Sequence, residues 1–160
     1  MNGALLAMAE ALLADCRARK LKIATAESCT GGLIAATLTE IAGSSDVVER
    51  GFVTYSNEAK MELLGVPAAA LKAHGAVSAA VARAMVEGAL ANARADIAVA
   101  VTGIAGPTGG TAAKPVGLVH FAAQRRGRGP VLHDEVFPGD RASVRLATVG
   151  KALALLRGIL

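Results

Sequence analysis

The residue in this chain with the clearest potential for chemistry is Ser28, within the stretch "AESCTGG". A predicted strand, "KIATA", precedes it and a predicted helix, "TGGLIAATLTEIAG", follows it. The start of a helix offers free N–H groups and the positive end of the dipole, which suit a phosphate or a developing oxyanion. The residues around the serine do not match the G-x-S-x-G nucleophile elbow. Two interpretations therefore stand: Ser28 caps the next helix, or it is a nucleophile.

A serine nucleophile needs a base, and the best candidate is Lys60. It lies one turn into the predicted helix "NEAKMELL", for which Asn57 is the expected cap. A lysine can accept a proton only if burial or nearby positive charge lowers its pKa. The alternative is an ordinary solvated lysine. His120 and His133 fall within predicted strands and are poorly placed for the role.

Two further stretches are typical of anion binding. "TGIAGPTGG" matches neither the Walker A pattern nor G-x-G-x-x-G, yet its glycines would let backbone amides approach a phosphate closely; a plain flexible turn is the alternative. In "PGDRASVR", Asp140 is a natural helix cap, and it places Arg141 and Arg145 on one face of the first turns. A positive charge at the N-terminus of a helix is unfavourable unless an anion binds beside it. The alternative is that both arginines are solvated, in which case the electrostatic cost is small.

The elements that must position these residues alternate along the chain. Helical spacing, apolar runs and glycine-rich breaks predict α-β-α-β-α-α-β, then a hairpin of two strands and a closing helix. The first helix covers about residues 4–20, the second runs from Cys29 or Thr30 to Gly43, and Ser78 caps a long one. This order predicts an α/β fold with a mixed, mostly parallel sheet between two helical layers. Ligands bind at the carboxyl ends of the strands in such sheets.

Length and composition narrow the class of protein. The 160 residues fit a single domain, and with 53% hydrophobic but only 2% aromatic residues the core must consist of small aliphatic side chains. No apolar run is long enough to span a membrane, so a cytoplasmic protein is expected. The net charge of +4 is dispersed and stacking aromatics are few, which favours a small anionic ligand over nucleic acid. Cys16 and Cys29 lack the spacing of a metal site. Because the chain is so rich in apolar residues, it is also expected to bury some of them in a homo-oligomer.

Five stretches in order, "AESCTGG", "GFVTYSNEAK", "GIAGPTGG", "KPVG" and "GDR", closely resemble the CinA C-terminal domain family. The resemblance extends from about Leu6 to Leu156. It implies a three-layer α/β/α domain that, in the enzymatically active members, hydrolyses the carboxamide of nicotinamide mononucleotide (NMN) without a cofactor. Ser28 matches the family nucleophile, Lys60 the proposed base, and Tyr55 a tyrosine of the active site that orients Lys60 or contacts the ligand.

The resemblance also implies a set of substrate-binding residues. Arg141 is assigned to the 5′-phosphate, with Arg145 as a weaker second, and Thr102 stands where some relatives carry serine. The full set expected to bind substrate is Thr30, Gly31, Asn57, Thr102, Gly103, Arg141 and Arg145. Many CinA proteins carry an additional N-terminal domain that is missing here, which suggests a stand-alone amidase. A non-catalytic nucleotide-binding module and an amidase for a related pyridine or nucleoside substrate remain the alternatives.

Overall fold

The computed structural model describes residues 2–160, which form one five-stranded sheet in the order β2-β1-β3-β4-β5. The strands are β1 (Ile23–Glu27), β2 (Val48–Val53), β3 (Ile97–Gly103), β4 (Leu118–Arg125) and β5 (Val131–Val136). β1 pairs in parallel with β2 and β3, whereas β4 pairs antiparallel with β3 and β5. Only β4 therefore runs against the others, and the predicted mixed, mostly parallel sheet is confirmed.

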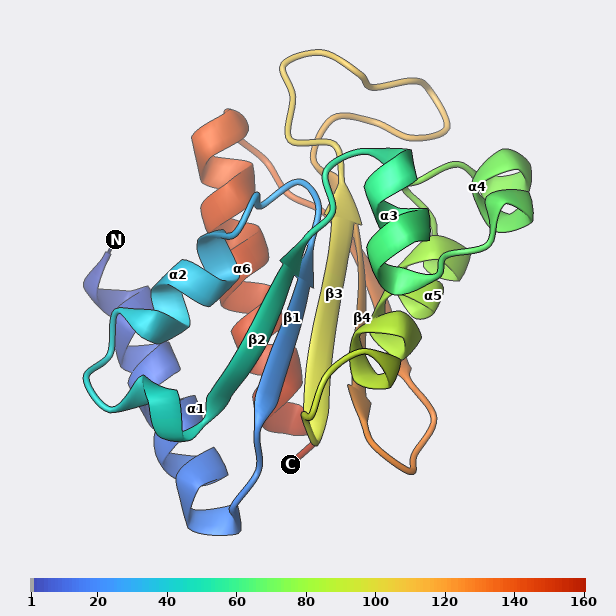
Figure 1. Ribbon diagram of the computed structural model, residues 1–160. Helices are drawn as coiled ribbons and strands as arrows, with labels where there is room; N and C mark the ends of the chain where they lie inside the picture. Colours follow the sequence, from blue (N-terminus) through green and yellow to red (C-terminus); the bar gives the residue numbers. More distant parts are fainter. Residues whose placement is uncertain (1) are drawn as a thin grey trace.

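Helices cover both faces of this sheet, as the alternating order predicted (Figure 1). On one face lie α1 (Gly3–Arg19), α2 (Leu33–Thr39) and α6 (Arg141–Gly158), and on the other α3 (Asn57–Leu64), α4 (Ala68–His74) and α5 (Ala79–Ala91). A single 3-10 turn, η1 (Ser44–Asp46), leads into β2. The fold is thus a three-layer α/β/α sandwich.

The central strand β3 divides the core into two layers of different character. Its larger side chains (Ile97, Val99, Val101) belong to the cluster shared with α1 and α6, while Ala98 and Ala100 face α5. Small residues on that face let the helices pack tightly. A Cβ added at Gly88 of α5 would come within 1.9 Å of the carbonyl oxygen of Leu64 at the end of α3. This close approach fixes α3, and with it Lys60, against α5, which itself packs on the sheet.

Several predicted boundaries need correction. The second helix begins at Leu33 instead of near Thr30, because Gly31 and Gly32 have φ values of +57° and +101°, outside the helical region. It ends at Thr39, well before Gly43. The cap of α3 is Ser56, whose Oγ accepts a hydrogen bond from the Ala59 N–H at 3.0 Å, and not Asn57.

Other predicted features are confirmed. The Ser78 side chain caps α5 by accepting from Val81 N–H, and Asp140 caps α6 by accepting from Ser143 N–H. β4 and β5 form the expected hairpin. Within residues 2–160, none of the helices combines the length and the apolar character that a bilayer crossing requires.

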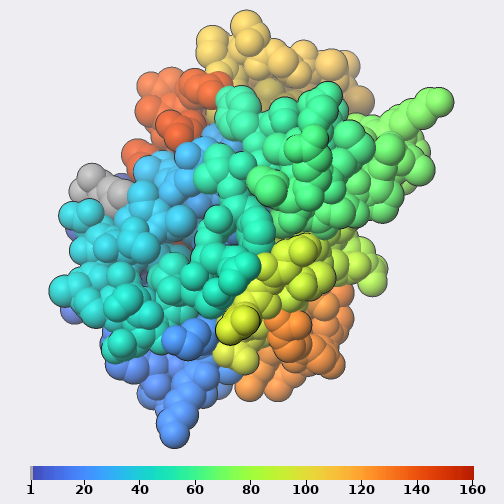
Figure 2. Space-filling model, in the orientation of Figure 1, coloured from blue at the N-terminus to red at the C-terminus, as the bar shows by residue number. Residues whose placement is uncertain are grey.

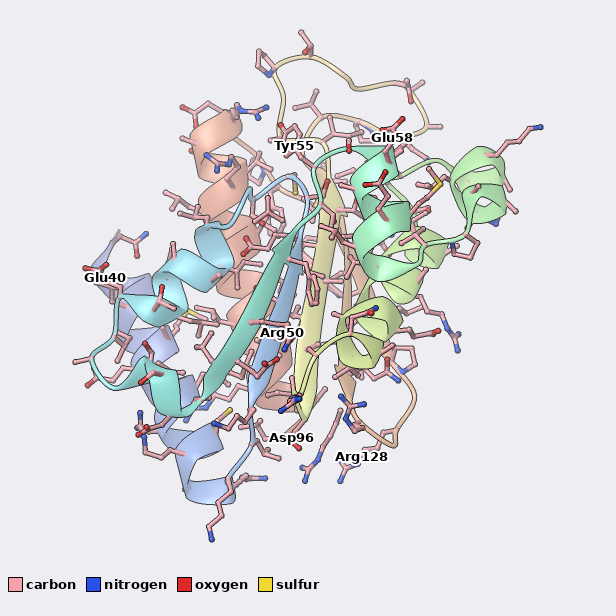
Figure 3. All side chains as sticks on the ribbon, in the orientation of Figure 1. Glu40, Arg50, Tyr55, Glu58, Asp96 and Arg128 are labelled. Atoms are coloured by element: carbon pink, nitrogen blue, oxygen red, sulfur yellow. The ribbon has the colours of Figure 1, made fainter. Side chains whose placement is uncertain are left out.

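The three neighbouring parallel strands all end at the same edge of the sheet, the upper edge in Figure 1. Tyr55 and Glu58 lie at this edge, and Asp96 and Arg128 lie at the opposite one (Figure 3). The segments that follow β1, β2 and β3 therefore meet in space, although they are far apart in sequence.

Candidate active site

A pocket of about 280 Å³ opens at the carboxyl edge of the sheet. In the same region of Figure 2 the loop after β3, the start of α6 and the region of α3 adjoin one another. The walls come from the turn after β1, the β2–α3 connection, the α4–α5 connection, the loop after β3 and the first residue of α6. The lining residues are Ser28, Cys29, Tyr55, Asn57, Lys60, Ala76, Val77, Thr102, Gly103, Ile104, Ala105, Gly106, Thr108, Gly109 and Arg141.

Ser28 and Lys60 are in direct contact at the floor of this pocket. The Nζ of Lys60 lies 2.9 Å from the Oγ of Ser28. Nζ also donates to the carbonyl oxygens of Thr54, at 2.8 Å, and Tyr55, at 3.3 Å. Two of its N–H groups are thereby occupied by carbonyls, and the third tetrahedral position faces the serine. In the neutral amine that position is a lone pair, which can accept the hydroxyl proton of Ser28.

The surroundings of Lys60 favour the neutral amine. The residue is only 1% exposed, and burial lowers the pKa of its amine below the ordinary value of 10.5. No carboxylate within residues 2–160 forms an ion pair with it, so little compensates the cost of burying the charge. Lys60 is thus not the solvated helix lysine of the alternative interpretation.

Ser28 does not cap the following helix, because Glu27 performs that task. The Glu27 side chain is fully buried and accepts from the N–H groups of Ile34, at 2.9 Å, and Ala35, at 3.0 Å. Its Oε1 also accepts from the Thr30 hydroxyl at 2.5 Å. A carboxylate at the end of the strand therefore satisfies the start of α2, and the serine hydroxyl remains available to Lys60.

The turn that carries Ser28 also presents backbone donors. Ser28 N–H donates to the Val101 carbonyl and Gly31 N–H to the Ser28 carbonyl. The N–H groups of Cys29 and Thr30 have no acceptor among the residues that the structure describes. Unpaired amides beside a nucleophile are the groups that stabilise an oxyanion in acyl transfer.

The Cys29 side chain lines the pocket but is a poor competitor for Ser28. Burial raises the pKa of its thiol to about 11. The reactive form of cysteine is the thiolate. At neutral pH this thiol is therefore almost entirely protonated, and it lacks a contact with Lys60 of the kind that Ser28 makes.

Arg141 crosses the mouth of the pocket. Its guanidinium donates to the carbonyl oxygen of Gly106 at 2.9 Å and to the hydroxyl of Tyr55 at 3.0 Å. Both partners are neutral, and no ion pair of Arg141 occurs between residues 2 and 160. Its positive charge therefore stays available to an anion that enters the pocket.

The structure separates the remaining predicted residues into two groups. Asn57, Thr102 and Gly103 line the pocket, and the Thr102 hydroxyl donates to the Ala76 carbonyl at 2.9 Å. Thr30, Gly31 and Arg145 lie outside the lining. The Thr30 hydroxyl donates to Glu27, and the Arg145 guanidinium donates to the carbonyls of Cys29 and Thr30.

Sequence reasoning missed several parts of the wall. Ala76 and Val77 come from the connection between α4 and α5 and carry no polar signal that would mark them. The glycine-rich stretch also contributes Gly106, Thr108 and Gly109 to the wall. The pattern of glycines in that stretch did not show which of its residues would line the pocket. Within the described residues, no group of three or more His, Cys, Asp or Glu side chains could hold a metal ion.

A family model, the CinA C-terminal domain, matches residues 5–160 of this chain. The chain belongs to the CinA C-terminal domain family. Among curated proteins, it is 54% identical over 141 residues to the nicotinamide-nucleotide amidohydrolase PncC of Escherichia coli strain K12, covering 88% of this chain and 85% of that protein. It is also 52% identical over 139 residues to a putative competence-damage inducible protein of Caldicellulosiruptor bescii, covering 87% of this chain.

Members of the CinA family differ in length. The present chain spans 34% of the Caldicellulosiruptor protein and a similar share of its relative in Symbiobacterium thermophilum. Among solved structures, the competence/damage inducible protein CihA from Agrobacterium tumefaciens superimposes with a TM-score of 0.97 at 51% identity, covering 99% of this chain and 96% of that one. A CinA superfamily protein from Escherichia coli has a TM-score of 0.91 at 36% identity, covering 98% and 91%.

Proposed function

We propose that this protein is an amidohydrolase that converts NMN to nicotinic acid mononucleotide and ammonia through an ester on Ser28. The observation that carries the proposal is the contact between the Ser28 hydroxyl and the buried amine of Lys60 at 2.9 Å. The similarity to PncC over most of both chains supports this choice of substrate.

In the first half of the reaction, the Oγ of Ser28 attacks the carboxamide carbon and its proton passes to the Nζ of Lys60. A C–O bond forms and the carbonyl π electrons move to oxygen, which gives a tetrahedral oxyanion. The backbone N–H of Cys29, which lines the pocket and has no acceptor among the described residues, stabilises this charge. Such donors are worth roughly 3–4 kcal/mol in comparable enzymes.

The intermediate then collapses by breaking its C–N bond. The protonated amine of Lys60 gives its proton to the departing nitrogen, so that ammonia leaves instead of an amide anion. The product on the protein is an ester between Ser28 and the carboxyl group of nicotinic acid mononucleotide, with the ribosyl 5′-phosphate still attached to the ring. Because Thr54 and Tyr55 hold Nζ in place, the same amine serves first as base and then as acid.

In the second half, water takes the place of ammonia. The water oxygen attacks the ester carbon while Lys60 accepts a proton from the water. The C–O bond to Ser28 then breaks. The proton returns to the Oγ of Ser28, which restores the starting state. The released carboxylate is nicotinic acid mononucleotide.

The pocket lining accounts for recognition of the nucleotide. Arg141 binds the 5′-phosphate, because its charge has only neutral partners and phosphate accepts charge-assisted hydrogen bonds. Val77 and Ile104 offer apolar surface to the pyridine ring. Asn57 and Thr102 supply polar contacts to the sugar or the carboxamide, and Tyr55 holds Arg141 in position.

The direct test is to incubate the purified protein with NMN and to measure both ammonia and nicotinic acid mononucleotide. Equal amounts of the two products are expected, together with a transient mass increase on Ser28 from the acyl group of nicotinic acid mononucleotide, ribosyl phosphate included. NMN binding without ammonia release would contradict the proposal and favour a nucleotide-binding module. Release from the riboside but not from NMN would indicate a different substrate.

A further inference from the structure

The turn that carries Ser28 is held from two sides by oppositely charged residues that the reaction itself does not use. Glu27 lies beneath it, in the sheet, and Arg145 reaches it from α6. We refer to Glu27 and Arg145 together as the turn clamp. Neither side chain lines the pocket.

Glu27 binds only the donors of the turn and of the following helix. Its partners are the Thr30 hydroxyl and the N–H groups of Ile34 and Ala35, so both carboxylate oxygens are occupied. The side chain is fully buried, and a buried carboxylate is tolerated only where such donors surround it. The position of the carboxylate therefore determines where the turn leaves β1 and enters α2.

Arg145 binds only acceptors of the same turn. Its Nε donates to the Cys29 carbonyl at 3.2 Å and one terminal nitrogen donates to the Thr30 carbonyl at 2.9 Å. The guanidinium also lies over Gly31, where an added Cβ would be 3.6 Å from it. Since each carbonyl shares a rigid peptide plane with the next N–H, these two contacts fix the N–H groups of Thr30 and Gly31. The Gly31 N–H in turn donates to the Ser28 carbonyl, whose peptide plane contains the Cys29 N–H.

We infer that the turn clamp of Glu27 and Arg145 positions Ser28 and the neighbouring N–H groups for acyl transfer. This inference rests on the proposed function. It replaces the expectation that Arg145 contacts the substrate phosphate, because the guanidinium is already occupied by the turn and lies outside the pocket lining. The clamp residues are positioning residues, since neither contacts the reacting atoms.

A positioning role has a distinct kinetic signature. Loosening the turn misaligns Ser28 in the transition state but leaves the pocket that binds the ground state intact, so kcat falls while KM changes little. The loss should be the same for NMN and for nicotinamide riboside, which lacks the phosphate. A phosphate contact would behave in the opposite way, with an effect confined to NMN.

The experiment compares Glu27→Gln, Arg145→Met and Arg145→Lys with two matched controls. Arg157→Met removes another arginine of α6, which pairs with Asp15 away from the pocket. Asn2→Ala removes a helix cap from α1 and so reproduces a loss of stability without touching the turn. For each variant, kcat and KM are measured on both substrates, and amide hydrogen exchange is followed in the segment 28–35.

We expect kcat to fall about 10- to 100-fold in Glu27→Gln and Arg145→Met, the range that loss of a charge-assisted hydrogen bond produces. Exchange in segment 28–35 should accelerate in both, and not in the controls. Arg145→Lys should recover only part of the loss, because an ammonium does not reproduce the guanidinium fork to two carbonyls.

Three results would overturn the inference: unchanged exchange in segment 28–35, faster exchange with unchanged kcat, or an effect of Arg145→Met restricted to NMN. If Glu27→Gln does not fold, the Arg145 variants decide the question, because that side chain is only half buried. If the wild-type protein releases no ammonia from either substrate, the proposed function fails, whereas the exchange data still decide whether the two residues hold the turn.

Discussion

Two serines at the entry to helices have opposite roles in this molecule. Ser78 precedes α5 and its Oγ accepts from the Val81 N–H at 3.2 Å, as an ordinary cap does. Ser28 precedes α2, but its Oγ contacts the amine of Lys60 at 2.9 Å. The difference lies in the preceding strand: Glu27 satisfies the start of α2 and thereby frees Ser28.

The comparison shows how a fold makes a common residue available for chemistry. A serine at the start of a helix is normally consumed by the unpaired N–H groups there. Two left-handed glycines keep residues 28–32 out of the helix, and a carboxylate takes over the capping. Among the described residues, the Ser28 hydroxyl then has one hydrogen-bond partner, the buried Lys60.

The sharpest test of the contrast is Ser28→Ala. Turnover of NMN should be abolished, because no other hydroxyl within residues 2–160 contacts Lys60. The fold should persist, because Glu27 and not Ser28 satisfies the start of α2. Ammonia release and the unfolding midpoint would be measured together. Retention of more than a few per cent of the activity would show that the two serines do not differ in the proposed way.

Lys60→Arg should have the second largest effect, a loss of activity by orders of magnitude. Arginine keeps the charge, but its pKa is too high for it to serve as a base. In the wild type, kcat should rise with pH through an apparent pKa below 10.5, because burial lowers the pKa of the amine. A flat profile between about pH 6 and about pH 9 would count against Lys60 as the base.

The same lowered pKa has a consequence for stability. Between the lowered value and 10.5, the unfolded chain carries a proton on Lys60 that the folded protein does not. The contribution of this group to the free energy of unfolding therefore rises with pH in that window. In urea unfolding, the free energy of unfolding of the wild type minus that of Lys60→Met should therefore increase with pH in this window.

Arg141→Ala should give a smaller and more selective loss, since it removes a positive charge from the pocket lining and leaves Ser28 and Lys60 in place. We expect the loss of kcat/KM for NMN to correspond to about 1.5–3 kcal/mol of transition-state stabilisation, the value of a charge-assisted hydrogen bond. Hydrolysis of nicotinamide riboside should be nearly unchanged. Equal losses on both substrates would mean that Arg141 acts on structure or chemistry, not on the phosphate.

Ser78→Ala should have the smallest effect and completes the comparison. Loss of the cap should lower the free energy of unfolding by about 1 kcal/mol, with kcat on NMN almost unchanged. Chemical denaturation and a steady-state assay of the same preparation would check both. The difference between the two serines would be established if Ser78→Ala lost stability but kept its activity, and Ser28→Ala lost activity but kept its stability.

The amino-acid sequence by itself determined much of the fold. Apolar periodicity and caps such as Ser78 and Asp140 are local signals, and they predicted the order of elements and the mixed sheet. The order, with the rule that ligands bind where parallel strands end, also led to Ser28 and Lys60 as candidates, and the helix start at Asp140 led to Arg141. All three residues line one pocket.

Only the tertiary structure decided what each of these residues contacts. Nothing local shows that Lys60 is buried, because its burial depends on the close packing of α3 against α5 at Gly88. Nothing local shows that Glu27 caps α2 or that Arg145 reaches the turn from α6, since both depend on side chains meeting across elements distant in sequence. Propensity and spacing act over a few residues, whereas hydrogen-bond partners and burial are set by the packed layers.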